Sequence, residues 1–162
     1  MYDDSRDLIA GVEQGRTLVA AAASDSVLVS ERAIGRLVRH ARAHGVDHVA
    51  PAGEDLFLPR VSAHAGSVMG GGRWLTGWMD ARFVSDRLPT VPAVSCDVLV
   101  AHDLDWADAA LERQVRVAKV LVIGPRVRWA ACRRLRAWAA AAGARVHEVS
   151  RHGAFILRRG EL

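Results

Sequence analysis

The sequence predicts an α/β protein, a three-layer Rossmann-like sandwich with a mainly parallel sheet and an antiparallel hairpin near its C-terminal end. Short apolar runs alternate with amphipathic helical stretches along the chain, which is typical of βαβ units. The apolar runs are nearly continuous Val and Leu, which indicates strands covered on both faces. A chain of 162 residues with this pattern predicts one domain, 1–162.

The first part of the chain contains one ambiguous element and one clear helix. We expect residues 4–23 to form a single amphipathic helix; a shorter helix followed by a strand at 17–22 is the alternative. A buried strand is predicted at 26–29. The following helix, 30–44, has polar residues suited to a cap at its start and ends at Gly45.

The middle of the chain predicts little regular structure. A weak strand is expected at 46–50. Four of the five prolines and a run of three glycines then fall within 51–93, which predicts an irregular insertion with a short hairpin through 74–84.

The remaining elements complete the βαβ pattern. A proline and a glycine bound the last helix, as is common at the first turn and the C-terminal end. In chain order we expect a strand at 97–101, a helix at 106–118, a strand at 119–123, a helix from 125 to 143, and a hairpin of 145–149 with 154–158.

Composition excludes several classes of protein. No apolar run is long enough to span a bilayer, and the acidic start of the chain does not resemble a secretory signal, so we expect a cytoplasmic protein without a membrane partner. Cys96 and Cys132 lack the spacing of a metal site or a disulfide scaffold. Both are expected to be buried apolar side chains.

Charge is divided unevenly along the chain. Residues 1–112 contain 10 arginines and 16 acidic residues, a net charge of −6, whereas 113–162 contain 11 arginines, one lysine and two glutamates, a net charge of +10. This asymmetry indicates either a surface that binds a polyanion or a homo-oligomer with complementary faces.

Polar residues follow the predicted strands, where the ligand crevice of a parallel sheet lies. His102 is the candidate general acid or base, and Asp103 and Asp105 are candidate catalytic residues and ligands of Mg or Mn. In the alternative reading, Asp105 caps the next helix and Asp108 lies in its first turn. The candidate substrate-binding residues are Glu31, Glu54, Asp55 and Arg126.

The last predicted helix presents a basic side. Helical spacing places Arg126, Trp129, Arg133 and Arg136 together, roughly opposite the apolar residues of the helix. Guanidinium groups beside an indole suit phosphate neutralisation with base stacking, and they also suit a protein interface.

Two functions from different classes follow. The leading hypothesis is a small enzyme that acts on a phosphorylated or nucleotide-like substrate at the strand-end rim and depends on a divalent metal. The alternative is a non-catalytic module that uses the basic helix, 126–142, to bind nucleic acid or to form a homo-oligomer.

Overall fold

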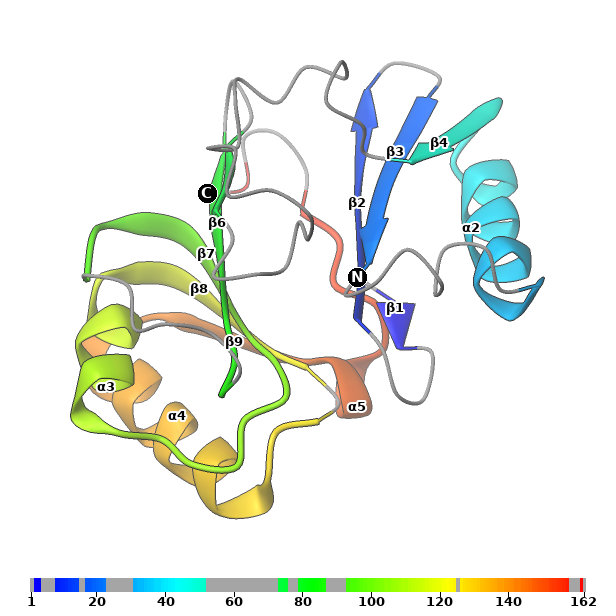
Figure 1. Cartoon of the computed structure of the whole chain (residues 1–162). Coiled ribbons are helices and arrows are strands. Elements are labelled where there is room, and N and C mark those ends of the chain that lie inside the picture. The colour runs from blue at the N-terminus through cyan, green and yellow to red at the C-terminus, as the bar shows by residue number, and fades with distance from the viewer. Residues whose placement is uncertain are drawn as a thin grey trace.

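A computed structural model describes residues 2–3, 8–14, 17–22, 31–51, 73–75, 79–86, 93–124, 126–157 and 161 (Figure 1). None of the helices in these ranges is long and apolar enough to cross a membrane.

The strands are β1 (Tyr2–Asp3), β2 (Leu8–Gln14), β3 (Thr17–Ala22), β4 (His48–Pro51), β5 (Arg73–Leu75), β6 (Asp80–Val84), β7 (Cys96–Ala101), β8 (Ala118–Ile123) and β9 (Arg145–Glu148). The helices are α2 (Glu31–Ala43), α3 (Ala109–Arg116), α4 (Trp129–Ala142) and α5 (Val149–His152).

The larger sheet has the order β5-β6-β7-β8-β9, and its strands from β6 to β9 are all parallel. This sheet, with the helices that connect its strands, confirms the α/β class and the mainly parallel arrangement. The strands predicted at 46–50, 97–101 and 119–123 correspond to β4, β7 and β8. The strand predicted at 26–29 lies outside the described residues, and the single domain stays a prediction.

Helices α3 and α4 lie together on one face of the larger sheet (Figure 1). Strands β7, β8 and β9 follow one another in the same direction across the sheet, so right-handed connections place both helices on the same side. The core between them is mainly apolar, although α3 also buries Gln114. Its innermost members include Leu99, Leu121, Val115, Leu135 and Ala139.

The opposite face of the same strands is also buried. Val98 and Val100 of β7 lie beside Val120 and Val122 of β8 in the sheet register, and each is at most 3% exposed. Burial on both faces explains why these strands are almost continuously apolar in sequence.

The smaller sheet corrects the first helix prediction. Residues 8–14 and 17–22 form the antiparallel strands β2 and β3, so a single helix over 4–23 is wrong for these residues, and the alternative of a strand at 17–22 is right. Alanine and valine dominate the segment, and their local preference is too weak to oppose pairing between strands. β3 also pairs in parallel with β4, and α2 contacts β4.

The C-terminal antiparallel hairpin is also wrong for the described residues. β9 pairs in parallel with β8, and the chain then turns into the short helix α5. No strand forms in 154–157. Val149 begins α5 and is buried, whereas the next three residues are exposed. The short helix therefore packs against the rest of the protein through this one side chain.

Glycines end the helices where the sequence predicts. Gly45 follows α2 with φ at 67°, and Gly143 caps α4 with φ at 71°, conformations that glycine adopts without strain.

Two further elements differ from their predicted extent or place. Helix α3 is shorter than predicted, because the chain before Ala109 forms a loop. The predicted hairpin in 74–84 is confirmed as β5 and β6, and β6 belongs to the parallel sheet rather than to an irregular insertion.

Candidate functional site

The carboxyl ends of β6, β7 and β8 meet at one edge of the larger sheet, because these strands are parallel and in register. The residues that follow them form the strand-end rim. Two of its loops are joined by the Asp86 N–H, which donates to the Asp103 carbonyl over 3.2 Å, and by the Asp105 N–H, which donates to the Asp86 carboxylate. Asp86 is a rim residue that the sequence analysis missed.

A second pair of hydrogen bonds joins the loop after β7 to the loop after β8. The Leu104 N–H donates to the Arg126 carbonyl over 3.1 Å, and the Arg128 N–H donates to the Leu104 carbonyl over 2.8 Å. Backbone groups therefore hold the rim loops to one another.

The capping roles predicted for Asp105 and Asp108 are corrected by the structure. The cap of α3 is Asp108, whose carboxylate accepts a hydrogen bond from the Leu111 N–H over 2.8 Å. The prediction that Asp105 caps this helix is wrong, since the helix begins one turn later. Asp105 instead forms an exposed ion pair with Arg128, with 2.7 Å between Oδ1 and Nε.

His102 is enclosed at the end of β7. It is 9% exposed, and its backbone N–H donates to the Val84 carbonyl over 3.0 Å. Gly124 packs against it so closely that a Cβ there would lie 3.3 Å from His102 Nδ1. The neighbouring Asp103 has φ at 50°, a left-handed conformation that aspartate tolerates better than most residues. A general acid or base at His102 stays a prediction.

The structure does not bring all of the predicted rim residues together. Glu31 begins α2, which contacts the smaller sheet, and Glu54 and Asp55 lie outside the described residues. Within the described ranges, no three His, Cys, Asp or Glu side chains converge as a metal site would require. Metal binding by Asp103 and Asp105 stays a prediction.

A basic face surrounds the start of α4. Trp129 is 72% exposed, and the guanidinium of Arg133 lies 5.0 Å from the centre of its ring. Trp106 is 60% exposed, and the guanidinium of Arg134 lies 4.7 Å from its ring centre. We define the basic face as Trp106, Arg126, Arg128, Trp129, Arg133 and Arg134.

Arginines of the basic face differ in how they are engaged. Arg134 Nη1 donates to the Ala107 carbonyl over 3.0 Å, and Arg128 pairs with Asp105. Within the described part of the chain, Arg126 is exposed with no ion pair or hydrogen bond from its side chain, and Arg133 contacts only the indole. The contact between Trp106 and Arg134 is not predictable from local patterns, because residues 28 positions apart give no local signal of contact.

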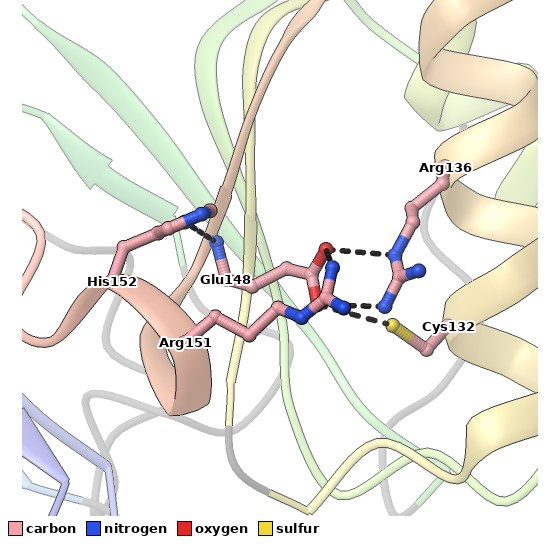
Figure 2. A network of polar contacts seen from close by, with 5 residues as sticks. All are labelled: Cys132, Arg136, Glu148, Arg151 and His152. Carbon is pink, nitrogen blue, oxygen red and sulfur yellow. Dashed lines mark hydrogen bonds and ion pairs between the residues drawn. The ribbon is translucent and has the colours of Figure 1, made fainter.

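Arg136 is left out of the basic face because its guanidinium is engaged elsewhere, and its predicted role in nucleic-acid binding or in an interface stays a prediction. Its guanidinium turns toward Glu148, the last residue of β9, as Figure 2 shows. Nε lies 2.7 Å from Oε1, and Nη2 donates to Oε2 over 2.7 Å. Helical spacing places the Cα of Arg136 near Trp129, but its long side chain reaches back to a buried carboxylate.

Glu148 is the centre of a polar network between α4, β9 and α5 (Figure 2). Arg151 Nη1 lies 3.8 Å from Oε1, Cys132 Sγ lies 3.9 Å from Oε2, and the Glu148 N–H donates to His152 Nδ1 over 3.1 Å. The hydrogen bond to Glu148 raises the pKa of Arg136. Cys132 and Cys96 are both buried free thiols, as predicted.

Comparisons with protein families, with curated proteins and with solved structures found no match.

Proposed function

We propose that this protein binds nucleic acid, with the phosphate backbone lying against the basic face. The observation that supports the proposal is the pair of exposed guanidinium groups of Arg126 and Arg133 near the start of α4, which form no ion pair with any of the residues that the structure describes. Each phosphate that an arginine neutralises releases condensed counterions, which is the main driving force for binding nucleic acid without sequence preference.

Two further features favour an anion at this place. The first turn of α4 contains no acidic residue, and its cap Arg128 makes no side-chain cap hydrogen bond. The partial positive charge of a helix N-terminus therefore adds to that of the arginines. The surrounding part of the chain is strongly basic, with a net charge of +10 over 113–162.

A second copy of this chain is the competing occupant of the basic face. Trp and Arg are the residues most enriched at the centre of protein interfaces, and residues 1–112 supply the opposite net charge. Phosphate is the better match to the four exposed arginines of the basic face, because within the described ranges Asp105 is the one carboxylate that pairs with any of them. The homo-oligomer stays a prediction, and the test below includes it.

The enzyme hypothesis has weaker support. In open parallel sheets the ligand crevice forms where the strand order reverses, whereas β6 to β9 follow chain order without reversal. Asp105, one of its two metal-ligand candidates, is paired with Arg128. An enzyme for phosphorylated or nucleotide-like substrates, a Mg or Mn cofactor and a cytoplasmic location stay predictions.

Fluorescence anisotropy with a labelled oligonucleotide at low salt tests the proposal. We expect binding, and we expect Arg133→Ala to weaken it about 10-fold. Arg39→Ala removes the same charge from an exposed site on α2 and should leave the affinity unchanged. Absence of binding, or equal loss in both variants, would contradict the proposal. Light scattering after size exclusion would then show whether Arg133→Ala dissociates an oligomer instead.

A further inference from the structure

We infer that the preferred ligand of the basic face is single-stranded nucleic acid, whose bases stack on the indoles of Trp106 and Trp129. This inference rests on the proposed function and narrows it to one class of nucleic acid. It starts from the two large aromatic side chains, which the structure leaves mostly exposed beside arginines.

Each indole is covered by a guanidinium at a short distance and remains open elsewhere. The ring-centre distances of 5.0 Å and 4.7 Å are those of cation–π pairs. With 72% and 60% of their surface exposed, Trp129 and Trp106 still offer most of their apolar area to solvent. A planar base that stacks there removes this area from water without displacing the arginine.

The two pairs lie on either side of the solvent-facing side of α4. Trp129 and Arg134 are five positions apart, which is about 140° around a helix. The opposite side of α4 is packed against the sheet by Ala131, Leu135 and Ala139. A strand that crosses the exposed side of α4 would therefore meet both indoles, with Arg133 between them.

The contacts of the two arginines suggest how stacking and phosphate binding combine. Arg134 is fixed by its hydrogen bond to the Ala107 carbonyl, so the loop that contains Trp106 is held to α4 before any ligand binds. Among the described residues, Arg133 contacts the Trp129 ring and forms no ion pair, so it can turn its donors to a phosphate while it remains over the ring.

Exposed indoles favour a single strand over a duplex. In a duplex the base faces are stacked on one another, so an indole on a protein surface reaches them only after unstacking, which costs several kcal/mol. A single strand exposes its base faces and can place phosphates and bases on alternate sides of the chain. Exposed indoles would add nothing to a purely electrostatic duplex contact.

The test compares three probes of equal length on the full chain: an oligothymidylate of about 16 nucleotides, the same backbone with abasic sites throughout, and the corresponding dT·dA duplex. We expect the oligothymidylate to bind most tightly. Trp129→Ala should weaken it about 5- to 150-fold and leave the abasic strand unchanged. Arg133→Ala should weaken both strands, and Trp129→Phe should restore most of the loss on oligothymidylate.

The outcomes separate this inference from the proposed function. If the abasic strand and the duplex bind as tightly as oligothymidylate, or if Trp129→Ala weakens all three probes equally, nucleic-acid binding stands and the stacking inference is overturned. If none of the three probes binds at low salt, both are overturned. Circular dichroism of each variant confirms that its fold is intact.

Discussion

Arg136 on α4 and Glu148 at the end of β9 form a two-point ion pair, with both nitrogen–oxygen distances at 2.7 Å (Figure 2). The Glu148 side chain is 8% exposed, whereas that of Arg136 is 40% exposed. The pair joins the basic helix to the edge of the sheet. It also takes Arg136 away from the surface on which the sequence places it.

Removal of Arg136 is expected to destabilise the fold rather than to alter ligand binding. Arg136→Ala would leave the Glu148 carboxylate buried without its main partner, whereas Arg133→Ala removes a guanidinium whose contact among the described residues is an exposed ring. We expect a clear fall in the urea midpoint for Arg136→Ala and almost none for Arg133→Ala. Equal midpoints would contradict the structural role of Arg136.

The helix-capping assignment gives a second prediction. Asp108→Ala is expected to cost about 0.5 to 2 kcal/mol, and Asp108→Asn or Asp108→Ser should recover most of that loss. Asp105→Ala loses only an exposed ion pair and is expected to cost less than about 1 kcal/mol. Thermal melting of the four variants compares these values, and a greater loss from Asp105→Ala would contradict the assignment.

Two glycines are predicted to respond oppositely to a methyl group. At Gly124 a Cβ would lie 3.1 Å from the Ala101 carbonyl oxygen and 3.3 Å from His102 Nδ1, so Gly124→Ala should cost about 1 to 3 kcal/mol. At Gly35, inside α2, a Cβ would meet no described atom within 4 Å apart from the neighbouring turns of its own helix, and Gly35→Ala should stabilise the protein by about 0.5 to 1 kcal/mol. Chemical denaturation measures both; a neutral Gly124→Ala would show that the rim is looser than described.

The free energy of unfolding should fall at acidic pH because of Asp97. Burial would raise the pKa of Asp97, but hydrogen bonds from Lys119 and from the Asp80 N–H outweigh it, so the pKa lies below its ordinary 3.8. Because the lowered pKa belongs to the folded state, the stabilisation is present above pH 3.8 and is lost as the pH falls through the folded-state value.

The comparison with Asp97→Asn measures this effect. Wild type should be more stable than the variant at pH 6, and the difference should shrink below about pH 4. The Lys119 side chain is 60% exposed and that of Asp97 is 22% exposed, so we expect a modest difference. A difference that stays constant between pH 6 and pH 3 would contradict the assignment.

Local sequence signals predicted β7, β8 and α4 well. β7 and β8 are buried on both faces, and α4 ends at a glycine in a left-handed conformation, so composition and helix-end rules locate them. The predictions of a helix over 4–23 and of a C-terminal hairpin were wrong for the described residues. Ala and Val at 17–22 suit helix and strand alike, and only the partner strands decide between them.

The candidate site was predictable only where its residues lie on one element. Trp129 and Arg133 are four positions apart on α4, so helical spacing pairs them. Trp106 with Arg134 and Arg136 with Glu148 depend on how α4 packs against the loop before α3 and against β9. Packing of that kind is a long-range property, and one sequence gives no measure of it.

The salt dependence of binding tests the proposed function most directly. The logarithm of the affinity for single-stranded oligothymidylate should fall linearly with the logarithm of salt concentration. In the variant with Arg126→Ala and Arg133→Ala together, the slope should flatten by about 1.4 units, since each phosphate contact on a single strand contributes about 0.7. Arg39→Ala with Arg42→Ala removes equal charge from α2 and should leave the slope unchanged. Equal slopes for the two double variants would contradict binding at the basic face.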